Sequence, residues 1–178
     1  MDEDIERILF HTATIQARID EIAARITEDY RDKELTVVAV LTGALMFTAD
    51  LLRRIPLPLK VDFISVASYH GATETSGEVK FDQLSLPDIE GRHVLVVDDI
   101  LDSGLTLDAI TRRFYNECRP LSVGICVLLS KRKVRSKQIA AEYVGFEIED
   151  EFVVGYGLDY QERYRNLPFV GVLKQSLI

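Results

Sequence analysis

Four long apolar runs alternate with stretches of helical periodicity, and this alternation constrains the fold more than any other feature of the chain. The apolar runs cover residues 36–43, 61–69, 92–100 and 122–130. The stretches that suit helices cover residues 12–30, 44–55 and 105–117. Runs of valine and leucine without polar alternation are typical of strands that are covered on both faces. Strands that alternate with helices of about 10 to 15 residues predict an α/β fold with a doubly wound, mostly parallel sheet.

Local signals set the expected ends of these elements. The first helix is indicated by apolar residues that recur every three or four positions, namely Ile15, Ile19, Ile22, Ile26 and Tyr30. The helix over 44–55 should stop before Pro56. Residues 70–78 are small, polar and contain glycine, which predicts a mobile loop, and a short strand over 79–85 should return from it.

The pattern changes beyond residue 140, where only the short strand-like pieces EYVGFEI and EFVVGYGL remain. We expect residues 1–178 to form a single domain with a core over about 33–140. The N- and C-terminal segments, residues 1–15 and 141–178, should form a small cap subdomain.

Composition and charge exclude several classes of protein. The formal net charge of −8 argues against general affinity for nucleic acid or anionic membranes, which requires a basic face. The acidic start, MDEDIERILF, lacks the basic beginning and apolar centre of a signal peptide, and no apolar run approaches the roughly 20 residues that span a bilayer. Cys118 and Cys126 fit neither a disulfide framework nor a metal spacing, so we expect reduced thiols in a cytoplasmic protein.

Polar turns follow four of the expected strands: LTGA, ASYHG, DDILDSG and LLSKRK. In open α/β sheets ligands bind beyond the carboxyl ends of the strands. These turns should therefore converge on one composite site.

The stretch VLVVDDILDSGLTL, residues 94–107, carries the most specific chemistry. Asp98 and Asp99 should lie at the tip of a strand, while Ser103 and Thr106 open the following helix. Free backbone N–H groups and the helix dipole make such a helix start an anion site. A matching ligand has hydroxyls or a metal at one end and a phosphate at the other, as a ribose 5-phosphate does.

Three other interpretations explain this stretch less well. Helix capping accounts for one acidic or hydroxyl residue but not for three aspartates and a threonine. A calcium loop needs alternating ligands with glycine at its sixth position, which the stretch lacks. A phosphoacceptor receiver domain needs a later strand that ends in aspartate, and GFEIEDEF does not supply one.

The same stretch resembles the phosphoribosyl-pyrophosphate (PRPP) motif of the type I phosphoribosyltransferases. The segment VGFEIEDEFVVGYGLDYQERYRNLPFVGVL, residues 144–173, resembles the hypoxanthine-guanine phosphoribosyltransferases, as do LTGALMFTADLL and SYHGATETSGEVK. The resemblance implies a purine salvage enzyme that uses Mg²⁺ to convert PRPP and a 6-oxopurine into a nucleoside monophosphate and pyrophosphate. It also implies a homodimer or homotetramer, and the acidic charge predicts that the protein binds neither nucleic acid nor membrane.

The resemblance assigns the PRPP-binding roles by position. Asp98 and Asp99 would hold the ribose hydroxyls, and Asp102 would act as general base or acid beside the purine's imidazole nitrogen. The 5-phosphate would lie in the cradle formed by Ser103, Gly104, Leu105 and Thr106. Pyrophosphate would meet Thr42, Gly43 and Arg165.

It also assigns roles around the base and the metal. Lys131 would donate to the 6-oxo group, a polar readout that discriminates strongly against adenine. Phe152 would stack on the purine, and the backbone near Val153 and Asp159 would meet its edge. Asp159 would bind magnesium, with Asp98 and Asp99 nearby. Ser68 and Tyr69 belong to the loop that is expected to close over the site.

Two positions depart from many relatives, which carry lysine where this chain has Thr42 and, in some cases, Leu105. Both changes would weaken PRPP binding, and relatives often have a cis peptide before the first of them. Two alternatives stay open: a xanthine-preferring enzyme, and a non-enzymatic regulator that binds PRPP or nucleotide.

Overall fold

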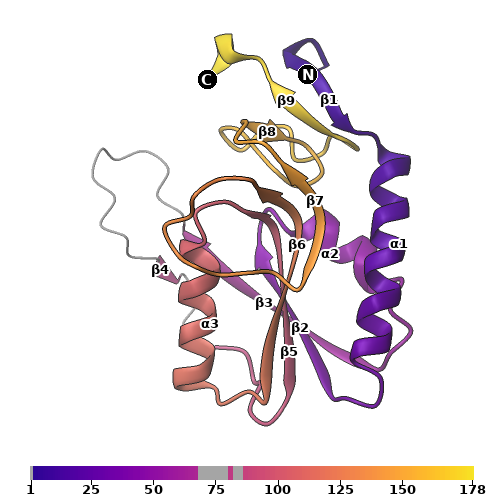
Figure 1. The fold of residues 1–178 in the computed structure, drawn as a ribbon, viewed down its shortest axis with the longest axis vertical. Helices are drawn as coiled ribbons and strands as arrows, with labels where there is room; N and C mark the ends of the chain where they lie inside the picture. The colour runs from indigo at the N-terminus through magenta and orange to yellow at the C-terminus, as the bar shows by residue number, and fades with distance from the viewer. Residues whose placement is uncertain (1, 68–79, 82–85) are drawn as a thin grey trace.

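The structure is a computed structural model, and it describes residues 2–67, 80–81 and 86–178 (Figure 1). Ser68, Tyr69 and the expected loop over 70–78 lie outside the described residues, as does most of the expected strand over 79–85.

The larger of two sheets has six strands in the order β4-β3-β2-β5-β6-β7. Its strands are β2 (Leu35–Leu41), β3 (Leu59–Ala67), β4 (Lys80–Phe81), β5 (His93–Leu101), β6 (Ser122–Lys131) and β7 (Tyr143–Ile148). Five strands pair in parallel, and only β4 runs antiparallel, beside β3. The predicted mostly parallel sheet is therefore confirmed.

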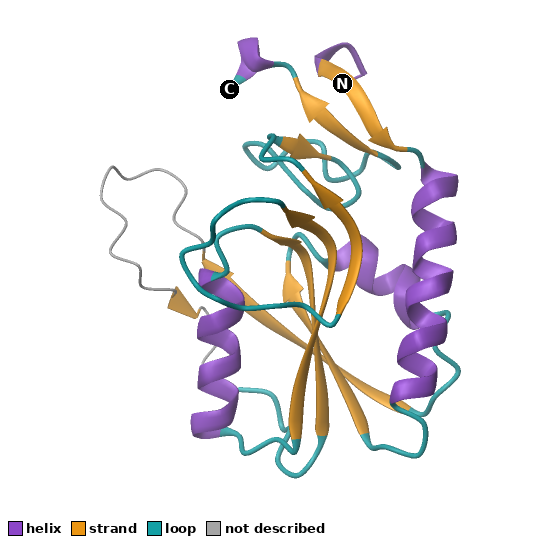
Figure 2. Cartoon of the chain, in the orientation of Figure 1, coloured by secondary structure: helices purple, strands orange, loops and turns teal. Residues whose placement is uncertain are grey.

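Helices cover both faces of this sheet, as a doubly wound fold requires (Figure 2). They are α1 (Thr12–Asp29), α2 (Leu45–Leu52) and α3 (Leu105–Glu117). Because strand side chains alternate between faces, Val37 and Val97 pack in the cluster beneath α1 and α2, whereas Val38 and Val96 pack in the cluster beneath α3.

Helix α2 ends at Leu52, three residues before its expected end at Ile55. Its final turn tightens, because the amides of Arg54 and Ile55 bond to carbonyls only three residues earlier, at 3.0 and 3.2 Å. A proline disfavours the helical conformation of the residue before it, so Pro56 disfavours a helical conformation at Ile55.

A second, three-stranded antiparallel sheet joins the two ends of the chain. It contains β1 (Ile5–Phe10), β9 (Val170–Leu173) and β8 (Val153–Val154) in the order β1-β9-β8. Short 3₁₀ turns lie at Asp2–Asp4 and Gln175–Leu177. This sheet confirms the small cap subdomain built from both terminal segments, and it lies beyond one edge of the larger sheet (Figure 1).

The piece EYVGFEI, expected in the cap, instead forms β7 and pairs with β6 in the larger sheet. Pairing with β6 covers a strand edge that would otherwise be exposed, and Tyr143 and Ile148 at the two ends of β7 are buried. Helix α1 likewise packs on the larger sheet. The single-domain organisation stays a prediction. Within the described ranges, no helix is both long and apolar enough to cross a membrane.

Candidate active site

The turns that follow β2, β5, β6 and β7 meet at one edge, because these strands are parallel and adjacent. The register brings their ends together: Leu101 pairs with Ser130, and Lys131 pairs with Ile148. The acidic turn, the lysines after β6 and the acidic residues after β7 are thus neighbours, as the sequence predicted for the first two.

The turn between β5 and α3 forms an open helix start. Gly104 precedes α3 with a φ of 80°, and the first helical bond runs from the Asp108 amide to the Gly104 carbonyl at 3.0 Å. The amides before it belong to the first turn, which lacks helical partners. Ser103 Oγ accepts only a long bond of 3.4 Å from the Leu105 amide. Hydroxyls and amides at a helix start suit a phosphate.

Gly104 is also required by packing. A Cβ atom there would lie 2.8 Å from Cγ2 of Ile139 and 3.0 Å from the Lys137 carbonyl oxygen. The Lys137 amide in turn donates to the Ser103 carbonyl at 3.2 Å. The segment around Lys137 therefore covers one side of the cradle and holds its shape.

Asp98 and Asp99 form a crowded acidic pair. Strand β5 continues to Leu101, so both lie inside the strand rather than at its tip. Asp98 is 7% exposed, and burial, together with the neighbouring Asp99 carboxylate, raises its pKa well above the ordinary value. Burial also raises the pKa of Asp99, although the Arg165 charge opposes this. Hydroxyl donors or a cation from a ligand would relieve this crowding.

The turn after β2 touches Asp99 directly. The Leu41–Thr42 peptide is cis. A Cβ atom on Gly43 would lie 1.9 Å from Oδ2 of Asp99, and one on Gly157 would lie 2.0 Å from the Gly43 carbonyl oxygen. Three segments that are distant in sequence thus meet where only glycine fits.

Arg165 joins this contact from the segment after β8. Its Nη1 donates to the Gly157 carbonyl at 2.8 Å, and its Nη2 pairs with Oδ1 of Asp159 at 2.9 Å. The predicted pyrophosphate residues Thr42, Gly43 and Arg165 therefore lie together, beside Asp99. Asp159 also accepts the Glu162 amide at 2.9 Å.

Two lysines and two aspartates gather next to the acidic turn. Lys131 Nζ lies 3.1 Å from Oδ2 of Asp102 and 2.9 Å from Oδ1 of Asp150. Lys133 pairs with Oδ1 of Asp102 and lies 3.2 Å from Oδ1 of Asp150. The Lys131 side chain is only 11% exposed, so this lysine is not a freely solvated surface residue.

Phe152 and Val153 differ in exposure. Phe152 is 40% exposed, and its ring meets Tyr160 edge-on, with 5.4 Å between ring centroids. Val153 is buried in β8. The Phe152 side chain is therefore available for stacking and is not part of the core.

The donor set fits magnesium held partly by a ligand. Among the described residues, no three His, Cys, Asp or Glu side chains gather as a metal cluster. Asp98 and Asp99 form one carboxylate group and Asp159 another. Mg²⁺ usually keeps several waters and binds one or two carboxylates plus substrate phosphates. Asp159, or the Asp98–Asp99 pair, could hold the ion in that way.

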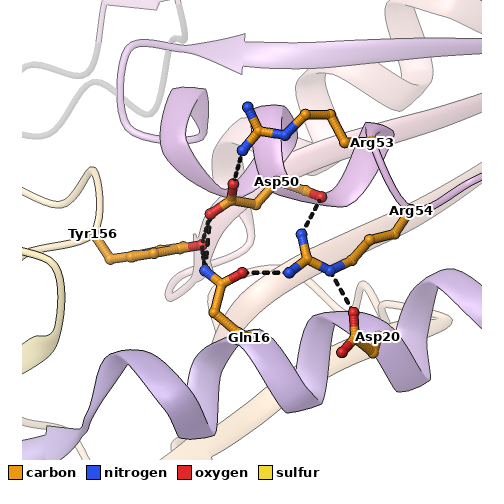
Figure 3. Close-up of polar contacts among 6 residues, drawn as sticks. All are labelled: Gln16, Asp20, Asp50, Arg53, Arg54 and Tyr156. Carbon is orange, nitrogen blue, oxygen red and sulfur yellow. Dashed lines mark hydrogen bonds and ion pairs between the residues drawn. The ribbon is translucent and has the colours of Figure 1, made fainter.

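A polar network braces the segment after β8 (Figure 3). The Tyr156 hydroxyl donates to Oδ2 of Asp50 on α2, and Gln16 Nε2 on α1 donates to both groups at 2.9 Å. Arg53 pairs with Asp50, and Arg54 bonds to the Asp50 carbonyl, to Gln16 and to Asp20. Tyr156 immediately precedes Gly157, so the network reaches the pyrophosphate turn.

Sequence reasoning missed Lys133, Asp150, Tyr156 and the Gly157 backbone. Lys133 and Asp150 each lie two residues after the end of a parallel strand, and this position at the carboxyl end of the sheet could have suggested them. Tyr156 and Gly157 act through contacts with distant segments, for which the local sequence holds no signal. A cavity of about 490 Å³ lies at the other end of α3 and contains none of the predicted site residues.

Comparisons with known proteins agree with this geometry. Residues 8–161 match the phosphoribosyl transferase domain family. A hypoxanthine-guanine phosphoribosyltransferase from Bacillus subtilis is 46% identical over 178 residues, which cover 99% of this chain and 98% of that protein.

Solved structures are similar over the same length. A hypoxanthine phosphoribosyltransferase from Staphylococcus aureus matches with a TM-score of 0.93 at 44% identity, covering 99% of this chain and 96% of that one. The Trypanosoma cruzi enzyme, studied for the role of its C-terminal region on oligomeric state and activity, matches with a TM-score of 0.90 at 39% identity, covering 98% of this chain and 94% of that one.

Proposed function

Because this chain belongs to the phosphoribosyltransferase family, and within it to the hypoxanthine-guanine branch, we propose that it is a purine salvage enzyme. It transfers the 5-phosphoribosyl group of PRPP to hypoxanthine or guanine and releases IMP or GMP and pyrophosphate. In this pentosyltransferase reaction the bond from the ribose C1 atom to pyrophosphate breaks, and a bond from C1 to a purine imidazole nitrogen forms.

One observation carries this proposal: three chemically distinct groups meet at the carboxyl edge of the sheet. An anion cradle opens α3, a crowded acidic pair lies beside it, and the lysine–aspartate group stands next to both. PRPP and a 6-oxopurine together present a phosphate, ribose hydroxyls and a carbonyl in matching order.

The cradle holds the 5-phosphate through the first-turn amides of α3 and the hydroxyls of Ser103 and Thr106. Asp98 and Asp99 accept hydrogen bonds from the ribose hydroxyls. As the bond to pyrophosphate breaks, C1 becomes cation-like, and nearby carboxylates stabilise the developing positive charge.

The base lies between Phe152 and the lysine–aspartate group. Lys131 donates to the 6-oxo group, and Asp102 takes the proton from the imidazole ring. Backbone groups near Val153 and Asp159 meet the pyrimidine edge. An amino group at position 6 of the purine is itself a hydrogen-bond donor and would face the Lys131 donor without an acceptor. Adenine is therefore excluded.

Pyrophosphate lies on the backbone amides of the Thr42–Gly43 turn, next to Arg165. Asp159 would hold a Mg²⁺ ion, with the Asp98–Asp99 pair close to the ribose, and the ion would supply positive charge to the pyrophosphate leaving group. The absence of lysine at position 42 leaves the amides of the turn and the Arg165 guanidinium as the contacts that bind this end of PRPP.

A steady-state comparison of four bases tests the proposal. The protein is incubated with PRPP, Mg²⁺ and hypoxanthine, guanine, xanthine or adenine, and nucleotide formation is measured. We expect turnover with hypoxanthine and guanine and none with adenine. Dominant turnover of xanthine would favour the xanthine-preferring alternative. No nucleotide from any base would sink the proposal and favour a non-enzymatic regulator.

Assembly and location are further proposals. We place the protein in the cytoplasm, since Cys118 and Cys126 are free thiols. We expect a homodimer or homotetramer, in keeping with the exposed apolar side chains of Leu45 and Met46 at the start of α2. Light scattering coupled to size exclusion measures the mass directly, and a monomer would contradict this expectation.

A further inference from the structure

Lys133 is a second cation beside the general base. Together with Lys131, Asp102 and Asp150 it forms a set of four charges, here called the charge cluster. Each aspartate in the cluster contacts both lysines. The proposed reaction gives roles to Lys131 and Asp102 only, and Lys133 and Asp150 therefore require a separate explanation.

A turn after β6 separates the charge cluster from a second set of charges. Strand β6 ends at Lys131, and the Lys133 amide bonds back to the Lys131 carbonyl at 3.1 Å, so both lysines reach the same two aspartates. Arg132 lies between them and pairs instead with Glu147 and Glu149, at 3.0 and 3.5 Å. A positive side chain in the same stretch thus stays outside the charge cluster, which makes Arg132 a matched control for Lys133.

The two oxygens of Asp102 contact different lysines. Oδ2 lies nearest Lys131, and Oδ1 lies nearest Lys133. The Asp102 side chain is 40% exposed and follows the end of a strand, so packing alone does not fix its orientation. When Lys131 turns toward a 6-oxo group, Lys133 still holds Oδ1 and leaves Oδ2 directed at the base.

Asp150 orients both lysines. Lys131 donates to it at 2.9 Å, and Lys133 donates to both of its oxygens at 3.2 and 3.3 Å. An ammonium group has three donors, so after its bond to Asp150 Lys131 keeps donors for a carbonyl and for Asp102. The anion between the lysines also reduces the repulsion between them.

We propose that Lys133 is a positioning residue for the proton-transfer step, which holds the Asp102 carboxylate in line with the purine while Lys131 reads the 6-oxo group. This inference rests on the proposed function, in particular on Asp102 as the group that accepts the proton. The bond to Asp102 raises the pKa of Lys133, and the bonds from both lysines lower the pKa of Asp150, so both groups stay charged at neutral pH.

Kinetics of three variants test the inference. Lys133→Met keeps most of the length of the side chain and removes its charge, Lys133→Arg keeps the charge, and Arg132→Met is the control. Acid–base catalysis contributes about 10²- to 10⁴-fold, so misplacing the base should lower kcat by roughly tenfold. We expect this loss in Lys133→Met, with the KM for PRPP changed less than about twofold. Lys133→Arg should recover most of it, and Arg132→Met should match the wild type.

A double variant separates positioning from general structure. In an Asp102→Ala background Lys133→Met should lower kcat no further, since the residue acts only through Asp102. These exposed ion pairs contribute little to stability, so thermal unfolding should barely change and every variant should fold.

Several results would overturn the inference while the wild type remains active. The first is an unchanged kcat in Lys133→Met, and the second is a loss of kcat in Arg132→Met as large as that in Lys133→Met. The third is a further loss of kcat when Lys133→Met is added to Asp102→Ala, as large as its loss in the wild-type background. The fourth is a rise in the KM for PRPP in Lys133→Met as large as its loss of kcat. A wild-type protein without turnover on any base would overturn the proposed function itself.

Discussion

At position 43 the absence of a side chain decides whether the turn after β2 can reach Asp99. The contact is so close that a methyl group would overlap the carboxylate, and Gly157 approaches the same turn from the other side. At Gly157 the neighbour is the Gly43 carbonyl, a backbone group that cannot move aside, whereas at Gly43 it is the Asp99 side chain, which would have to shift. The residue scale thus sets the shape of the proposed pyrophosphate site.

We predict that Gly43→Ala raises the KM for PRPP by roughly 10- to 100-fold, because overpacking costs about 1–3 kcal/mol and 1.4 kcal/mol is a factor of ten. Steady-state kinetics at saturating hypoxanthine measure this. Gly91→Ala is the control, since Gly91 has a φ of 67° with nothing within 4 Å of an added Cβ. It should lose about 1–2 kcal/mol of stability with an unchanged KM. Equal kinetics for both variants would contradict the prediction.

At the scale of elements, a hydrogen-bond network ties two helices to the segment after β8 (Figure 3). Asp50 is the common acceptor on α2, for Tyr156 and for Gln16 of α1. Burial opposes the ionisation of Asp50, but the bonds from Tyr156 and Gln16 and the Arg53 charge outweigh it and lower its pKa. The network therefore stabilises the fold only while Asp50 is ionised.

We predict that Tyr156→Phe lowers the free energy of unfolding by about 1 kcal/mol at pH 7. A lowered pKa gives stability that is present above the ordinary aspartate pKa of 3.8 and is lost as the pH falls through the lower folded value. The difference from wild type should therefore shrink below about pH 4. Urea unfolding between pH 3 and 7 measures it.

Tyr115→Phe is the control for this pH dependence. The Tyr115 hydroxyl accepts the Val123 amide at 3.1 Å, a bond to which no carboxylate contributes. The loss of unfolding free energy in Tyr115→Phe should be equal at every pH between 3 and 7. A pH-independent difference for Tyr156→Phe would show that Asp50 is not the partner that matters.

At the scale of the whole molecule, three separate apolar clusters hold the fold. Among the described residues, two lie on opposite faces of the larger sheet, the one beneath α1 also reaching Val153 and Val172, and the third contains Val154, Tyr164, Leu167 and Leu173 in the cap. The Leu173 amide donates to the Phe152 carbonyl at 3.1 Å. The cap cluster thus supports the residues proposed to bind the base, while the phosphate cradle is supported by the α3 face.

We predict that Leu173→Ala raises the KM for hypoxanthine more than the KM for PRPP. The side chain is 1% exposed, and truncation should lower stability by about 2–5 kcal/mol while loosening β8. Ile26→Ala is the control, a fully buried residue of α1 in a different cluster. It should lower stability by a similar amount without this selective effect. A parallel rise of both KM values in Leu173→Ala would contradict the prediction.

The sequence alone determined the features that depend on neighbours along the chain. Helix periodicity predicted α1 to within a residue and α3 with the observed bounds. Apolar runs predicted the parallel strands, and the acidic turn predicted an anion cradle at the start of α3. These signals are local, because side-chain period and turn chemistry are properties of a few consecutive residues.

Only the tertiary structure decided which distant segments meet. It placed EYVGFEI in the larger sheet, paired β1 with β9, and joined Gly43, Asp99 and Gly157. It also brought Lys133 and Asp150 to Asp102. Such contacts depend on strand order and register, and a shift of one residue would turn each side chain to the other face. Burial of both sheet faces selects the correct register, and both faces are buried only when the whole chain has folded.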